Sequence, residues 1–300
     1  MKYKLFLLAV LTAICLLMNA DALVAGQSKS TEPRIFAEGV VSTGHEFTLT
    51  FMPDGKEAYF TRGFPDKKIS HVMRTQLLDG KWQTPVPVSF STDQWSDLDP
   101  CVSPDGKRLY FVSTRPVPGS QESARNMDIW YSDRVADDWS EPHHLENVNS
   151  PGKEGSPTVS KSGMLCFFSD RNAAANVNSI YCSELRAGKY GEPVKMGNEI
   201  NSGTSDTSPF LSPNGNVMLF YSTRPGGYGK ADLYVSFKQN GKWSQAKNLG
   251  TIVNTAEFEY NPSVSPDGNT FYFGRGGNIY EVPLEELKSA GLTPEQFRNK

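Results

Sequence analysis

Short runs in which apolar and polar residues alternate recur along the chain, each after a turn rich in Pro, Asp and Gly. The clearest run extends from Leu109 to Ser113 and follows the turn at Ser103–Gly106. Pro fixes φ and Gly readily adopts a positive φ, so Ser-Pro-Asp-Gly between two β-rich runs predicts a hairpin. Related turns precede four more such runs, at residues 52–55, 160–163, 212–215 and 265–268. The pattern therefore predicts five hairpins.

Each hairpin begins after an acidic residue and is followed by a third β-rich run. In four copies a fourth segment then starts at an aromatic residue: Trp82, Trp139, Tyr190 or Trp243. The acidic positions are separated by 51, 57, 52 and 53 residues, and they are Glu46, Asp97, Glu154, Asp206 and Glu259. Four short strands repeated at this spacing are typical of a β-propeller blade. The sequence therefore predicts an all-β protein in which residues 32–283 form a five-bladed β-propeller.

The fifth copy lacks its fourth strand, and a matching segment lies near the other end of the chain. Glu32-Pro33 resembles Glu141-Pro142 and Glu192-Pro193, which begin outer strands. We expect residues 32–41 to complete the last blade, because such a closure leaves no unpaired sheet edge in the ring. Residues 284–300 form the remaining tail, which we expect to be helical or mobile.

The first 22 residues have the features of a secretory signal peptide. Lys2 and Lys4 precede an apolar run that ends at Met18, and Ala20 and Ala22 provide small residues for cleavage. The run is too short to favour a membrane span. A lipid anchor is not expected, because the residues before Cys15 do not match a lipoprotein signal.

Charge and composition narrow the class of partner. Removing residues 1–22 takes away two Lys and one Asp, which leaves 28 basic and 32 acidic side chains and a formal charge of −4. Because no basic cluster stands out, we do not expect nucleic acid as a partner. We expect an exported monomer, periplasmic or secreted, without a membrane span after signal cleavage.

The repeated hairpin resembles the WD40-like β-propeller repeat of exported bacterial proteins. The likeness rests on Ser-Pro-Asp-Gly, on a strand ending in Ser-x-Arg as at Ser113–Arg115, and on an Asp-Ile/Leu-Trp/Tyr run such as Asp128–Trp130. The periplasmic propeller protein of the Tol system carries such repeats, as do propeller segments beside OmpA-type domains. The resemblance covers residues 32–283 and implies a fold. It implies little about function, because the motif residues recur in every blade.

The column of acids faces a matching column of arginines in the predicted blade. The acids precede the innermost strand and the arginines end the second strand, so antiparallel pairing places both at one face, at Arg62, Arg115, Arg171, Arg224 and Arg275. We expect bidentate acid–arginine pairs. They either hold strands and blades together or line a polar funnel that binds a ligand. A divalent cation between convergent carboxylates is a further possibility, and no other cofactor is expected.

Asp99 breaks the repeat. Two residues after each column acid stand Thr48, Asp99, Ser156, Ser208 and Asn261, and the only acid among them is in blade 2. Strand alternation would place Asp97 and Asp99 on one side. A glycoside hydrolase needs two carboxylates from one pocket. Candidate catalytic residues are therefore Asp99, Asp97 and Glu154, with Glu46 as another possible partner. His45 also has no counterpart in the other copies.

The remaining signals are weaker. Cys166 and Cys182 lie on neighbouring predicted strands, where either a disulfide or two buried thiols are possible. Cys101 is interpreted as a core residue, and the pair His143-His144 as an exposed pair with weak potential for metal binding. Ligand contacts are expected from two loops, residues 116–126 and 225–230.

Two functions follow from this sequence. We expect an exported, non-catalytic propeller that binds a protein, a carbohydrate or another small ligand at its funnel face. The alternative is an enzyme similar to a glycoside hydrolase, with its carboxylates at the central channel mouth.

Overall fold

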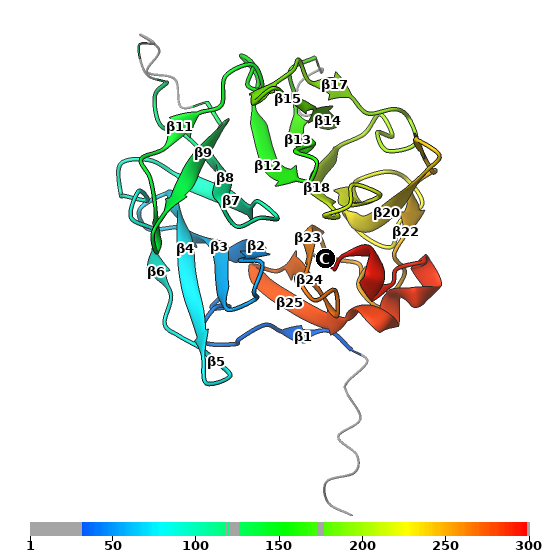
Figure 1. The fold of residues 1–300 in the computed structure, drawn as a ribbon. Coiled ribbons are helices and arrows are strands. Elements are labelled where there is room, and N and C mark those ends of the chain that lie inside the picture. Colours follow the sequence, from blue (N-terminus) through cyan, green and yellow to red (C-terminus); the bar gives the residue numbers. More distant parts are fainter. Residues whose placement is uncertain (1–31, 118, 120–125, 173–176, 299–300) are drawn as a thin grey trace, which may run out of the picture. The chain divides into compact units, whose positions relative to one another are not determined.

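Five antiparallel sheets follow one another around a central axis in the computed structural model (Figure 1). The structure describes residues 32–117, 119, 126–172 and 177–298. The five sheets confirm the predicted five-bladed β-propeller. The predicted signal peptide lies outside the described residues.

Three consecutive strands form the inner part of each blade. The innermost strands are β2 (Glu46–Phe51), β7 (Asp97–Val102), β12 (Glu154–Val159), β18 (Asp206–Leu211) and β23 (Glu259–Val264). The second strands are β3 (Glu57–Phe64), β8 (Arg108–Ser113), β13 (Leu165–Ser169), β19 (Val217–Ser222) and β24 (Thr270–Arg275). The third strands are β4 (Ile69–Leu78), β9 (Asp128–Val135), β14 (Ser179–Ser183), β20 (Asp232–Gln239) and β25 (Asn278–Pro283).

Short strands complete the outer edges of blades 1 to 4. In blades 1 and 2 they are β5 (Lys81–Trp82), β6 (Val86–Pro87), β10 (Asp138–Trp139) and β11 (His143–His144). In blades 3 and 4 they are β15 (Leu185–Arg186), β16 (Lys189–Tyr190), β17 (Val194–Lys195), β21 (Lys242–Trp243) and β22 (Lys247–Asn248). Because these edge strands are only two residues long, they expose few unpaired backbone groups to which another chain could hydrogen-bond.

The repeated turn has the chemistry that the sequence predicts. At Ser103–Gly106 the N–H of Gly106 donates to the Ser103 carbonyl at 2.8 Å, and φ of Gly106 is +72°. The Asp105 carboxylate accepts from the N–H of Lys107 at 3.1 Å. A residue with a Cβ is strained at this φ, so glycine fits the turn.

The N-terminal segment closes the ring. β1 (Arg34–Ile35) pairs antiparallel with β25, with Arg34 opposite Glu281 and Ile35 opposite Tyr280. The next residue, Phe36, is buried against the rings of Trp82 and Tyr272, with centroids 5.6 and 5.2 Å away. The predicted closure is confirmed. The strand is shorter than residues 32–41, because Ala37 has φ +43° and the chain turns there.

Aromatic residues of the outer hairpins seal the seams between blades. Trp139 of blade 2 packs edge-on against Tyr59 of blade 1 at 5.7 Å, and Tyr190 of blade 3 lies 6.4 Å from Tyr110 of blade 2. Such ring pairs stabilise a contact beyond the area that they bury. Blades 1 and 4 contribute Trp82 and Trp243 in the same way.

The C-terminal tail takes the place of the outer hairpin that blade 5 lacks. It forms two 3₁₀ helices, η1 (Leu284–Ala290) and η2 (Pro294–Gln296). Leu284 and Leu287 are fully buried in a cluster with Val217 and Leu219 of blade 4. The tail therefore covers apolar surface that a hairpin residue covers in the other blades. Within the described part of the chain, no helix has the length and apolar character needed to cross a bilayer.

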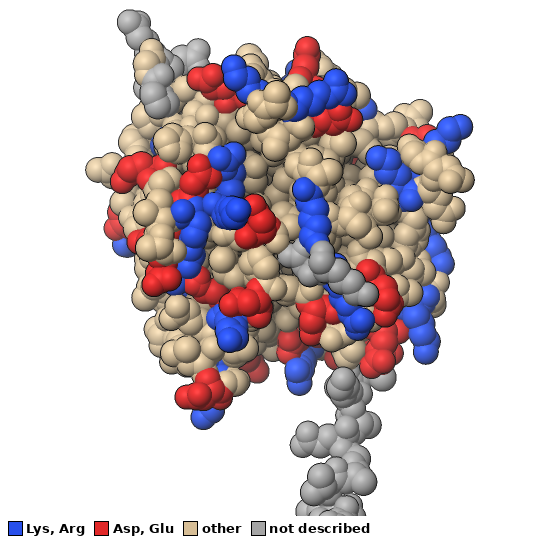
Figure 2. Space-filling view, in the orientation of Figure 1, with Lys and Arg blue, Asp and Glu red and all other residues tan. Residues whose placement is uncertain are grey.

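Basic and acidic side chains are interspersed over the face shown in Figure 2. That face carries no extended patch of one sign.

Closure by β1 can be tested with two substitutions in the same segment. Phe36→Ala removes a buried ring from the seam and should lower the free energy of unfolding by about 3–5 kcal/mol. Arg34→Ala is the matched control, because Arg34 is 76% exposed and its ion pair with Glu281 contributes about 0–1 kcal/mol. Urea denaturation measures both values. Equal losses for the two variants would contradict a closure that depends on this seam.

Candidate functional site

One face of the propeller carries a buried acid–arginine pair in every blade. We call it the acid–arginine face. It comprises the starts of the innermost strands, the ends of the second strands and the loops beside them. The N–O distances, from blade 1 to blade 5, are 2.6, 2.7, 3.1, 2.8 and 2.8 Å, for Glu46–Arg62, Asp97–Arg115, Glu154–Arg171, Asp206–Arg224 and Glu259–Arg275. The predicted pairing of the two columns is confirmed.

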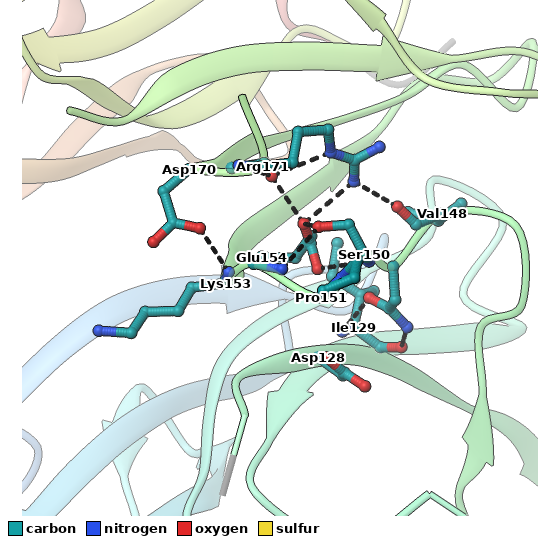
Figure 3. Close-up of polar contacts among 12 residues, drawn as sticks. Asp128, Ile129, Val148, Ser150, Pro151, Lys153, Glu154, Asp170 and Arg171 are labelled. Carbon is teal, nitrogen blue, oxygen red and sulfur yellow. Dashed lines mark hydrogen bonds and ion pairs between the residues drawn. The ribbon is translucent and has the colours of Figure 1, made fainter. Parts of the chain in front are cut away.

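Each acid also holds the chain segment that enters its blade, as Figure 3 shows for blade 3. Glu154 accepts from the N–H and the hydroxyl of Ser150 at 3.0 and 2.6 Å, and from the hydroxyl of Ser169 at 2.6 Å. Arg171 donates both to Glu154 and to the carbonyl of Val148. The pair therefore joins the link, the innermost strand and the second strand of a blade.

The arginines are held by aromatic rings as well as by charge. The guanidinium carbon of Arg224 lies 5.3 Å from the Phe220 ring and 4.6 Å from the Tyr234 ring. One nitrogen of Arg224 donates to Asp206 and to the carbonyl of Ile200. The expectation of bidentate pairs is wrong, because the other donors and acceptors are used by hydroxyls and backbone groups.

All five column acids are fully buried. Burial raises the pKa of Asp97 and of Glu154, and the hydrogen bonds and arginines beside them offset only part of this effect. At Glu46 burial acts in the same direction. Hydrogen bonds from Thr43 and Arg62 outweigh it and hold the pKa of Glu46 below its usual range. These carboxylates already have intramolecular partners, so a ligand at this face does not meet them directly.

Five polar side chains, one from each innermost strand, lie around the propeller axis. We call them the axial ring: Thr48, Asp99, Ser156, Ser208 and Asn261. Thr48 donates to Asp99 at 2.7 Å, and Ser156 donates to Asp99 at 2.9 Å from its hydroxyl and 3.0 Å from its N–H. Asn261 donates to Thr48, and the hydroxyls of Ser156 and Ser208 lie 3.3 Å apart.

The Asp99 carboxylate accepts hydrogen bonds from its neighbours in the axial ring. Hydroxyl and amide groups donate as well as accept, whereas an ionised carboxylate only accepts. Hydrogen bonds therefore converge on Asp99 from Thr48 on one side and from Ser156 on the other. Asp99 is 5% exposed, and burial raises its pKa above the usual range.

The predicted side-by-side arrangement of Asp97 and Asp99 is wrong. A β-bulge between Leu98 and Cys101 interrupts the alternation of the strand, and φ of Asp99 is +52°. Asp97 binds Arg115 and Ser91, whereas Asp99 binds neighbouring blades. The other four innermost strands have the same bulge, with positive φ at each axial-ring residue.

Sequence reasoning missed the bulges, although a signal was present. In four blades the residue after the bulge is proline, at Pro100, Pro157, Pro209 and Pro262. Proline has no N–H for the ladder and is confined within sheets to edges, strand starts and bulges. Proline in an innermost strand therefore indicates an irregular strand, and with it the axial position of Asp99.

A cavity lies on the axis on the other side of the axial ring from the acid–arginine face. We call it the axial cavity; its volume is about 110 Å³. Its walls come from all five innermost strands and from Phe297 of the tail. The candidate catalytic residues Asp97, Asp99 and Glu154 do not line it. The structure therefore does not bring these carboxylates together around a space for substrate.

The other candidates do not come together in one site. His45 is exposed, and His144 contacts Asp128 at 2.9 Å. The structure pairs Cys166 with Cys182 as a disulfide, which the sequence left open. Cys101 is a free thiol, and burial raises its pKa to about 11. No group of three or more His, Cys, Asp or Glu suited to a metal occurs in the described ranges.

Of the two loops predicted to contact a ligand, one is described in full. Most of residues 116–126 lies outside the described residues. Residues 225–230 are described, and Tyr228 is 53% exposed there.

Solved structures share this propeller fold, whereas no protein-family model and no curated protein matches the sequence. TolB from Acinetobacter baumannii matches with a TM-score of 0.49 and 17% identity over 79% of this chain and 54% of TolB. This chain thus spans about half of that TolB. A thermostable family-43 glycoside hydrolase matches with a TM-score of 0.52 and 10% identity over 82% of this chain and 91% of its own.

A gluconolactonase from Xanthomonas campestris matches with a TM-score of 0.45 and 11% identity over 84% of this chain and 94% of its own. The matching solved structures thus include TolB proteins. The likeness to segments beside OmpA-type domains stays a prediction. At these identities a common fold leaves the function to be argued from the site.

The raised pKa of Asp99 predicts how the free energy of unfolding depends on pH. A raised pKa means that the folded chain keeps a proton on Asp99 at pH values where the unfolded chain has released it. The contribution of Asp99 to the free energy of unfolding therefore falls as the pH rises from the ordinary pKa of about 3.9 toward the raised pKa in the folded chain. Asp99→Asn lacks this titration, so it should gain stability relative to wild type as the pH rises above about 4.

Urea denaturation at several pH values measures this difference, and a difference that does not change with pH would contradict it. Asp99→Ala is the comparison at neutral pH. It should lose about 1–3 kcal/mol more than Asp99→Asn, because it leaves buried donors of Thr48 and Ser156 unsatisfied.

Proposed function

We propose that this protein is an exported, non-catalytic β-propeller that binds a protein or a small ligand at its acid–arginine face. The observation that carries the proposal is a pair of exposed aromatic side chains there. Tyr228 is 53% exposed on the loop between β19 and β20, and Phe258 is 37% exposed just before β23. Aromatic side chains with rigid surroundings are typical anchors of binding surfaces.

Both aromatic residues are held in place before any partner binds. The N–H groups of Tyr228 and Gly229 donate to the carboxylate of Asp232 at 2.6 and 3.0 Å. The Phe258 ring lies 5.2 Å from Tyr221 and 5.9 Å from Tyr260. Preorganisation of this kind lowers the entropy that a partner must overcome on binding.

Export is supported by covalent chemistry as well as by the predicted signal peptide. Cys166 and Cys182 form a disulfide across β13 and β14. Disulfides persist in oxidising compartments and are rare in the cytosol. A periplasmic or secreted location is therefore part of the proposal.

The alternative is a glycoside hydrolase-like enzyme. Such an enzyme needs one carboxylate as acid and a second as base or nucleophile, both facing the sugar. Asp99 is enclosed by the axial ring, and Asp97 and Glu154 are paired with arginines. No arrangement of described carboxylates favours this reaction, so non-catalytic binding is preferred.

The proposal is tested by placing a photo-crosslinking residue at position 228 in the protein expressed in its own cell envelope. Position 194 is the matched control, because Val194 is 70% exposed on the outer edge of blade 3. We expect a crosslinked product of defined mass from position 228 and none from position 194. Phe258→Ala should reduce its yield several-fold, without a change in melting temperature.

Equal products from both positions, or none from either, would contradict binding at the acid–arginine face. Turnover of a polysaccharide that Asp99→Asn abolishes, with the melting temperature unchanged, would favour the hydrolase instead.

A further inference from the structure

The axial cavity has the form of a small-ligand site, separate from the acid–arginine face. Its volume of about 110 Å³ is somewhat below the roughly 150 Å³ of an apolar cavity that holds benzene, so it accommodates a ligand of about four or five non-hydrogen atoms. Aromatic rings of Phe51, Phe210 and Phe297 line it, together with prolines of the innermost strands and turns. One end is polar, formed by Thr48, Ser156, Ser208 and Asn261.

The polar end of the axial cavity has an unneutralised charge behind it. Asp99 bridges Thr48 and Ser156, which both line the cavity. Among the described residues Asp99 takes part in no ion pair, whereas every column acid has an arginine. Its partners are neutral hydroxyl and amide groups. Above its raised pKa Asp99 is ionised, and a cation in the cavity then meets the field of a buried carboxylate that no side chain neutralises.

A second polar group in the lining is also unused. Ser263 is 5% exposed, and its hydroxyl has no hydrogen-bond partner among the described residues. An unsatisfied buried hydroxyl costs free energy, which a bound donor or acceptor would recover.

The tail covers the end of the axial cavity near the repeated turns. Phe297 is 1% exposed and lies 6.2 Å from Phe210, ring to ring. Arg298 donates to the carbonyl of Asp267 in the turn of blade 5. A ligand would thus be enclosed by the chain itself.

We propose that the axial cavity binds a small organic cation, an amine with an apolar body. Its ammonium group faces the axial ring, and its body packs against Phe51, Phe210 and Phe297. Aromatic faces attract cations, and the effect grows as water is excluded. An anion of the same size is repelled by Asp99, and a neutral analogue gains no charge interaction.

Binding of small molecules to the unsubstituted protein tests the proposed cation site directly. Propylammonium, propanol and propionate have similar size and differ in charge. By calorimetry with the full chain, propylammonium should bind at least tenfold more tightly than propanol, and propionate should not bind. Equal affinities for the three, or no binding of propylammonium, would overturn the proposal.

Cys101 provides a reporter inside the axial cavity. It lines the cavity and is the free cysteine among the described residues. Cationic and anionic methanethiosulfonates of similar size should modify it at different rates, after each is normalised to a free thiol. We expect the cationic reagent to react at least tenfold faster and propylammonium to slow its reaction. Cys101→Ser is the control for labelling elsewhere.

The variant Asp99→Asn tests whether the charge of Asp99 causes the preference for the cationic reagent. In that variant the difference between the two reagents should disappear, while urea denaturation shows that the variant remains folded. A preference for the cationic reagent that persists in Asp99→Asn would contradict the proposed role of Asp99. If the wild type reacts too slowly to measure, Phe297→Ala should open the cavity and restore labelling. If Phe297→Ala is not labelled either, the proposed site is contradicted.

Discussion

The fold depends on a buried carboxylate that joins three separate segments of every blade. In blade 4, Asp206 accepts from the N–H and hydroxyl of Ser202 and from Arg224, which in turn donates to the carbonyl of Ile200. A buried charge is costly unless it is paired and hydrogen-bonded, and here each acid meets both conditions. Because an arginine and a hydroxyl from the preceding link contact the acid in all five blades, they fix where each link enters and where each innermost strand begins.

The axial ring is the second constraint, and it uses a different kind of contact. Its members come from five blades, and all have positive φ at a bulge. In four of the blades the ring residue is neutral, and Asp99 is the single acceptor on which the hydrogen bonds converge. The ring separates two regions of different chemistry. The acid–arginine face presents rigid exposed aromatics, whereas the axial cavity is apolar with a negative charge behind its polar end.

Repetition made much of the architecture predictable. The acid and arginine columns could be paired from antiparallel geometry alone, and the missing strand of blade 5 could be assigned to residues near Arg34. The axial position of Asp99 could not be derived by assuming a regular strand, because one extra residue at a bulge redirects the side chains that follow. The particular contacts of Leu284 and Leu287 with blade 4 could not be derived, since the tail has no repeat to compare it with.

The central claim is that the acid–arginine pairs build the propeller and do not serve as ligand-binding groups. A double-mutant cycle on Glu154→Gln and Arg171→Met, followed by urea denaturation, tests it most directly. Each single substitution should cost about 3–5 kcal/mol, because it leaves a buried partner without its counterpart. The double variant should cost clearly less than the sum of the two. Single variants as stable as wild type would contradict the claim.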